Sequence, residues 1–94
     1  MAQHTTISVA RATWTEITNA DATAITFQNL AGIDMLLKGT TGSAPSDLTG
    51  AIVYPPFTGE KLVTITDLFP NPASVDRLWV YYVAGPGSVM VSHA

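Results

Sequence analysis

Short runs of strand-forming residues, separated by glycine and proline, extend through the whole of this 94-residue sequence. Thr, Val, Ile and aromatic residues dominate the runs, and these side chains suit a pleated, half-buried surface. Seven glycines and six prolines punctuate the chain at short intervals, and no stretch of ten residues keeps a helical period. The pattern predicts an all-β protein, because short strands with frequent turns build sandwiches or barrels.

The spacing of polar and apolar side chains places the individual strands. A period of two is typical of a strand that turns one face to the core. The predicted strands cover residues 5–9, 12–18, 23–29, 33–38, 51–54, 61–66, 77–83 and 89–93, with a helical turn at 67–69, a turn at 19–21 and a loop at 71–76. The connections are too short for parallel crossovers. We therefore expect a compact antiparallel β-sandwich, jelly-roll-like, of seven to eight short strands, although alternation alone does not separate a sandwich from a small closed barrel.

The balance of charged and apolar residues is unusual for a chain of this length. The length allows one domain over residues 1–94, with residues 1–10 as a candidate extended N-terminal arm. Only 12% of the residues are charged while 47% are hydrophobic, and an ordinary soluble domain carries about twice that charge. A small domain has much surface for its volume and should need more polar surface, not less. No apolar run approaches the ~20 residues of a membrane span, so we expect the apolar excess to contact other protein chains.

The composition argues against several classes of function. A net charge of −3 with four scattered basic residues disfavours nucleic-acid binding. The absence of cysteine excludes disulfides, Cys-based zinc sites and a thiol nucleophile. His4 and His93 have no recognisable third ligand, no acidic loop has calcium spacing, and the serines lack a nucleophile elbow. The N-terminus shows no secretory signal. We expect no enzyme, no cofactor, no metal and no membrane segment.

Two aromatic segments carry the strongest functional signal. In 77–83, alternation places Leu78, Val80 and Tyr82 on one face and Arg77, Trp79, Tyr81 and Val83 on the other. Both faces are apolar enough for a central strand covered on two sides, but Trp, Tyr and Arg are also the side chains enriched at interface hot spots. The segment 54–57, Tyr-Pro-Pro-Phe, is either a corner plugged by aromatics or an exposed loop tip that docks on a partner. Trp14 fits either set, or a sugar-stacking platform.

The order of four stretches resembles a known group of proteins. These stretches are WTEIT at 14–18 with TAITFQN at 23–29, GTTGSAPSD at 39–47 with GAIV at 50–53, DLFP at 67–70 with RLWVY at 77–81, and VMVSHA at 89–94. Together they resemble small virion proteins of tailed bacteriophages, namely head decoration proteins and the bases of head fibres or spikes. The resemblance implies a compact antiparallel β-sandwich, no catalysis, and self-association on or near a capsid.

Two functions are therefore expected. The first is a structural virion protein of a tailed phage, assembled in the host cytoplasm, that binds itself and the major capsid or other virion proteins. Its expected contact residues are Arg77, Trp79, Tyr81, Tyr54, Phe57, His4 and Ile7. The second is a small carbohydrate- or receptor-binding β-sandwich module, which would stack a ligand on Trp14 or Trp79 and hydrogen-bond it from the polar loop 39–50.

Overall fold

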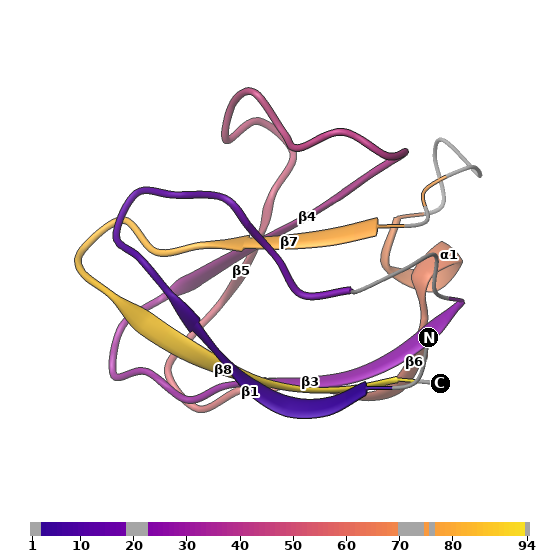
Figure 1. Ribbon diagram of the computed structural model, residues 1–94, viewed down its shortest axis with the longest axis horizontal. Helices are drawn as coiled ribbons and strands as arrows, with labels where there is room; N and C mark the ends of the chain where they lie inside the picture. Colours follow the sequence, from indigo (N-terminus) through magenta and orange to yellow (C-terminus); the bar gives the residue numbers. More distant parts are fainter. Residues whose placement is uncertain (1–2, 19–22, 70–74, 76, 94) are drawn as a thin grey trace.

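The computed structural model describes residues 3–18, 23–69, 75 and 77–93, which form two antiparallel sheets of four strands each. Figure 1 shows the sheets as two facing layers. The first sheet contains, in spatial order, β1 (Gln3–Val9), β8 (Gly87–His93), β3 (Ala24–Asn29) and β6 (Gly59–Thr64). The second contains β2 (Thr15–Glu16), β7 (Arg77–Tyr81), β4 (Met35–Thr40) and β5 (Ile52–Tyr54). A short helix, α1 (Ile65–Leu68), follows β6.

The strand order is that of a jelly roll. Strands β4 and β5 pair with one another, and outward from this hairpin β3 pairs with β6, β2 with β7, and β1 with β8. The nested ribbon then rolls up, so that β8 also pairs with β3 and β7 with β4. A ribbon of eight strands that rolls up into two four-stranded sheets in this order is a jelly roll. The predicted antiparallel β-sandwich is confirmed, and the two separate sheets decide against a closed barrel.

The core lies between the sheets and follows the predicted alternation. In β7 and just beyond it, Leu78, Val80 and Tyr82 are fully buried. The facing strand residues Ile25 and Phe27 of β3 are buried as well, as are Met35 and Leu37 of β4. The remaining buried apolar side chains are Val9, Ile17, Tyr54, Ile65, Val75, Val89 and Val91. Alternating burial of this kind is what a sheet with one face in the core requires.

Some elements differ in extent from the predicted runs. The run 12–18 forms only the two-residue strand β2, because Ala12 has a φ of 55°, which takes the backbone out of the extended conformation. The helical turn begins at Ile65 rather than at residue 67, because the Thr64 hydroxyl accepts the N–H of Asp67 and caps the helix there. The turn at 19–21 and most of the loop at 71–76 lie outside the described residues.

A buried asparagine joins the two sheets at one end of the sandwich. Asn29, the last residue of β3, is fully buried. Its Oδ1 lies 2.7 Å from the Tyr82 hydroxyl and accepts the N–H of Ala31 at 3.0 Å. Its Nδ2 donates to the Ile33 carbonyl oxygen at 2.8 Å, and to those of Tyr54 and Pro55 at 3.3 Å. One side chain thus satisfies backbone groups of two connections and the polar tip of the largest core side chain.

Candidate contact surface

The side of the second sheet that points away from the core carries most of the predicted contact residues. We call this side the outer face, and define it by the half-buried or exposed residues that alternate with the core positions of β2, β7, β4 and β5. Its members are Glu16, Leu36, Lys38, Thr40, Val53, Arg77, Trp79 and Tyr81. The strand register places Trp79 between Glu16 and Lys38, and Leu36 between Tyr81 and Val53. The loop 41–51 rises above this face in Figure 1.

Aromatic rings form the middle of the outer face. Trp14, just before β2, contacts Tyr81 with ring centroids 5.0 Å apart and planes tilted by 51°, which is within the range of favourable aromatic pairs. The indole N–H of Trp79 donates to the Thr40 hydroxyl at 2.9 Å. The polar edge of Trp79 is therefore already satisfied within the sheet, which leaves the ring as flat apolar contact area.

The charged groups of the outer face are paired with one another. Arg77 Nη1 lies 2.9 Å from Glu16 Oε2, which also accepts the Thr18 hydroxyl at 2.8 Å. Lys38 Nζ lies 2.8 Å from Asp47 Oδ1 in the loop above the face. The hydrogen bond from Lys38, helped by the N–H of Thr49, holds the pKa of Asp47 below its usual value. A partner covering these strands would meet Arg77 and Lys38 as members of ion pairs rather than as isolated charges.

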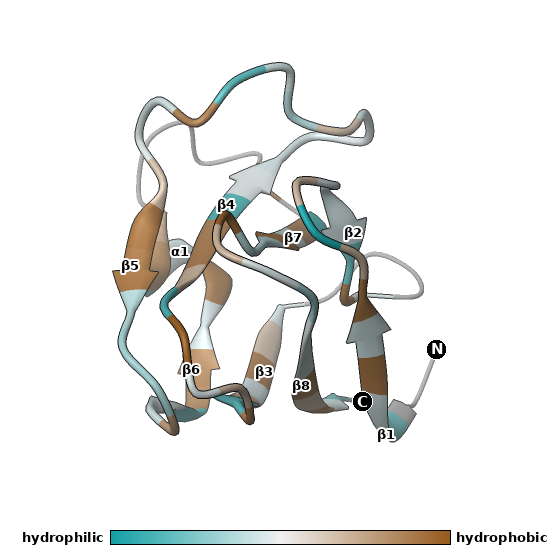
Figure 2. Ribbon diagram, turned by 90° about the vertical axis from the view of Figure 1, so that its left-hand side faces the viewer, coloured by the Kyte–Doolittle hydropathy of each residue, from teal (hydrophilic) through white to brown (hydrophobic). Residues whose placement is uncertain are grey.

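One end of the outer face is apolar and hollowed. Val53 of β5 is 52% exposed and Val83, just after β7, is 55% exposed. Together with Leu36, Ile33 and Pro56 they line a depression of about 460 Å³, whose other lining residues are Gly32, Ala84 and the exposed Asp34. Figure 2 shows β5 coloured mostly hydrophobic, at the left of the view. Exposed aliphatic side chains that adjoin an aromatic cluster are typical of a surface that binds another protein.

The predicted contact residues separate into three groups in the structure. Arg77, Trp79 and Tyr81 lie together on the outer face, half-buried. Tyr54 leaves the set of surface candidates, because only 8% of it is exposed and its ring packs edge-on against Phe27 at 5.0 Å. The Tyr54 hydroxyl bonds Glu60 at 3.3 Å.

The other three candidates lie on the first sheet or, in the case of Phe57, in the connection that leads into it from β5. Phe57 is 61% exposed and lines a hollow of about 250 Å³ over that sheet, so the 54–57 segment is both a plugged corner and an exposed tip. His4 and Ile7 lie on β1, the edge strand that residues 3–9 of the candidate arm form. His4 is exposed whereas His93, on the neighbouring strand, is buried among the residues that face the core, so the two imidazoles point to opposite faces of the sheet.

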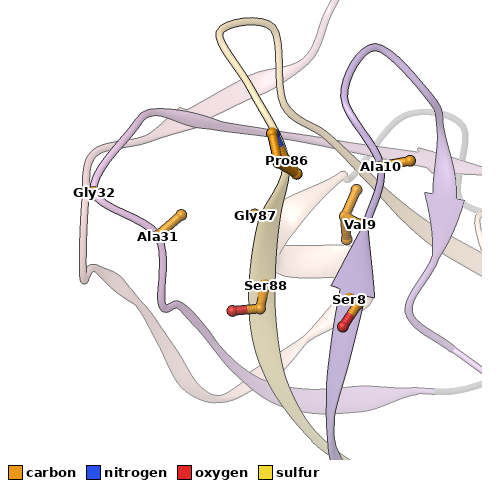
Figure 3. Close-up of a pocket in the computed structure, with 8 residues that line it drawn as sticks. All are labelled: Ser8, Val9, Ala10, Ala31, Gly32, Pro86, Gly87 and Ser88. Atoms are coloured by element: carbon orange, nitrogen blue, oxygen red, sulfur yellow. The ribbon is translucent and has the colours of Figure 1, made fainter.

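A third, wider depression of about 750 Å³ opens at the end of the first sheet (Figure 3). Its lining consists of Ser8, Val9, Ala10, Ala31, Gly32, Pro86, Gly87 and Ser88. The described residues around it offer two hydroxyls and backbone groups, without an acidic, basic or aromatic side chain. In the part of the chain that the structure describes, no three His, Asp or Glu side chains gather as a metal site. None of its described helices has the length and apolar character that a membrane crossing requires.

Sequence reasoning missed the polar partners that hold the outer face together. Glu16 and Thr40 were not expected to matter, yet they bond Arg77 and Trp79. The sequence carried no signal for either role, because Thr40 lies in the predicted loop 39–50 and the run 12–18 alternates too loosely to assign Glu16 to a face. Comparisons with protein-family models, with curated proteins and with solved structures find no match to this chain.

Proposed function

We propose that this protein is a structural component of a tailed-phage virion, which decorates the head or forms the base of a head fibre or spike. It would act by associating with itself and by contacting the major capsid or other virion proteins, without catalysis. The observation that carries the proposal is the outer face: an aromatic and aliphatic surface whose two basic groups, Arg77 and Lys38, are already paired within the same chain.

The chemistry of the outer face suits burial against protein. Trp, Tyr and Arg are enriched at the centres of protein interfaces, where unpaired charges are depleted. Arg77 and Glu16 remain paired with each other when a partner displaces the water around them. Covering them therefore does not leave an isolated charge in a low-dielectric environment. A standard interface buries about 800 Å² on each partner, and the whole molecule exposes 4910 Å². One such contact would cover a large part of this sheet face.

The fold and the sequence resemblance agree with this proposal without deciding it. Jelly rolls occur in viral capsid proteins and also in lectins, and a fold alone does not determine function. The described chain consists of a single sandwich, which is the architecture implied by the resemblance to head decoration and fibre-base proteins. Binding to a virion partner would stabilise the folded state by mass action, so a small domain with few charged residues gains stability once it is assembled.

Carbohydrate binding is a second candidate, and one observation favours it. The tilted Trp14–Tyr81 pair is half-exposed, as in a platform on which a sugar ring stacks. Sugar recognition also needs polar groups that converge on the ligand. On the outer face the indole N–H of Trp79 and the Lys38 ammonium bond groups of this chain instead. We therefore rank this function below assembly.

Binding to purified phage heads tests the proposal with a matched pair of variants. Val53→Lys places a charge on the outer face, and Leu62→Lys places the same charge on β6 of the other sheet, where Leu62 is 78% exposed. Co-sedimentation should show that wild type and Leu62→Lys bind, while Val53→Lys binds roughly tenfold more weakly or worse, because its ammonium must be desolvated at the interface. Equal binding by both variants would contradict the proposal. A protein that ignores heads and retains a glycan would support the second function.

A further inference from the structure

Each sheet ends in two edge strands, and the edges differ in how they are protected. The edge strands are β1 and β6 in the first sheet and β2 and β5 in the second. An edge strand presents unpaired N–H and C=O groups, so it is a template for pairing with another chain. Proteins block such pairing with short strands, bulges, prolines or charged side chains.

Three of the edges carry at least one protective feature. In β6 the register with β3 shifts between Ile25 and Phe27, and Leu62 at this bulge has a φ of 45°. A bulge twists the edge and interrupts its ladder. Strand β2 has only two residues, and β5 has three and ends at Pro55. These edges offer little regular backbone to a partner strand.

Strand β1 has none of these protective features. It runs for seven residues, QHTTISV, and pairs with β8 from Gln3 to Val9 without a shift in register. The segment contains no proline, glycine, lysine, arginine or carboxylate. His4, Thr5, Thr6 and Ser8 are exposed, and Ile7 is half-buried. Figure 2 shows β1 at the right as the outermost strand of its sheet.

We infer that β1 is the self-association edge of this protein, and that its occupant is β1 of a second copy in antiparallel orientation. The inference rests on the self-association that the proposed function includes. A two-fold axis at Thr6 aligns all seven residues of the strand with their mates, whereas an axis at a neighbouring residue leaves two of the seven unpaired. The two four-stranded sheets would then join into one continuous sheet.

The chemistry of the strand favours a second copy as the occupant. Around an axis at Thr6 the three central opposite pairs are Thr6 with Thr6, Thr5 with Ile7, and His4 with Ser8. Each pair has side chains on the same side of the sheet, and no carboxylate, lysine or arginine opposes another. The β-branched side chains suit cross-strand packing, and Ile7 gains cover on its exposed flank. This contact leaves the outer face of the other sheet free for a different virion protein.

Single cysteines test both the edge and its register, because the chain contains no cysteine. Thr6→Cys places two thiols opposite one another across the proposed axis, within the range that a disulfide spans. Thr49→Cys, in the exposed loop 41–51, is the matched control. Under mild oxidation we expect the Thr6→Cys chain to form a covalent dimer on the order of a hundredfold faster than Thr49→Cys, because the associated thiols have a high effective concentration.

Sedimentation velocity supplies the second measurement. Thr6→Lys should weaken self-association about tenfold relative to wild type, since it places like charges opposite one another at the axis. Thr49→Lys should leave self-association unchanged, and circular dichroism checks that both variants fold.

Equal cross-linking of the two cysteine variants, or self-association of Thr6→Lys equal to that of wild type, overturns the edge contact and leaves self-association standing. A monomeric wild type that still binds phage heads overturns both the inference and the self-association part of the proposed function, and leaves the contact with virion proteins standing. Loss of head binding with an intact Thr6 dimer overturns the proposed function alone.

Discussion

Replacement of Asn29 by alanine should cost this small domain a large part of its stability. The amide is fully buried, and three of its hydrogen bonds are short: 2.7 Å to the Tyr82 hydroxyl, 3.0 Å from the Ala31 N–H, and 2.8 Å to the Ile33 carbonyl oxygen. Each such bond contributes about 1 kcal/mol net. The small cavity left by the amide adds about 1 kcal/mol. We expect the free energy of unfolding to fall by about 3–4 kcal/mol, out of the roughly 5–15 kcal/mol typical of a domain.

Urea unfolding followed by tryptophan fluorescence measures this loss, and the neighbouring residue provides the control. Gln28 is on the same strand with the same amide chemistry, but it is only half-buried and donates one bond, to the Phe57 carbonyl oxygen at 3.0 Å. Gln28→Ala should therefore cost less than about 1 kcal/mol. The slope of the transition should stay close to that of wild type, since the exposed area on unfolding hardly changes.

The comparison between the two amides decides whether Asn29 holds the sandwich together. Tyr82→Phe, which removes the hydroxyl but keeps the ring, should cost about 1–2 kcal/mol, and the double variant less than the sum, because both changes break the same bond. If Asn29→Ala lowers the free energy of unfolding by no more than Gln28→Ala does, the buried network is not a stabilising element and the reasoning is refuted.

Three further predictions concern the core, the tyrosines and the outer face. Gly87→Ala should lower the unfolding free energy by about 1–3 kcal/mol, because a Cβ there would lie 2.6 Å from Cζ of Tyr82; an unchanged urea midpoint would mean that the ring shifts freely. Burial raises the pKa of both Tyr54 and Tyr82 to about 12 from an ordinary value near 10, so the stability they contribute is complete below pH 10 and is lost as the pH rises from 10 through 12. Two phenols that titrate near pH 10 in the folded protein, followed by phenolate absorbance, would contradict this. Trp79→Ala should weaken head binding about tenfold or more while lowering stability less than Asn29→Ala; a collapsed melting temperature with normal assembly of the remaining folded protein would place Trp79 in the core.

The sequence predicted those parts of the fold that depend on alternation. Met35 and Leu37 face the core and Lys38 faces out, as the run 33–38 indicated, because side chains in a strand alternate with a fixed period. The division of 77–83 into a buried and an outward face is confirmed for the same reason. The order of the strands was not predictable, since it depends on which distant strands pair, and local patterns carry no information on that.

The candidate surface shows where sequence patterns stop being informative. Tyr54 and Phe57 occur in one short motif, yet one is in the core and the other is exposed, because the chain turns between them. Asparagine is a residue type that is common in turns. Asn29 is instead buried, and its side chain links the two sheets. The pairing of Glu16 with Arg77 joins residues 61 positions apart, which no local reading detects.

The most direct test of the proposed function is a cryo-electron microscopy reconstruction of intact virions of a phage that carries this chain. We predict copies of the eight-stranded sandwich on the head, with Trp79, Tyr81 and Val53 of the outer face turned toward another virion protein. A virion that lacks the chain, or a reconstruction in which this face is bare to solvent while the sandwich is held by other surfaces, would contradict the account. The low charge of the sequence would then need a different explanation.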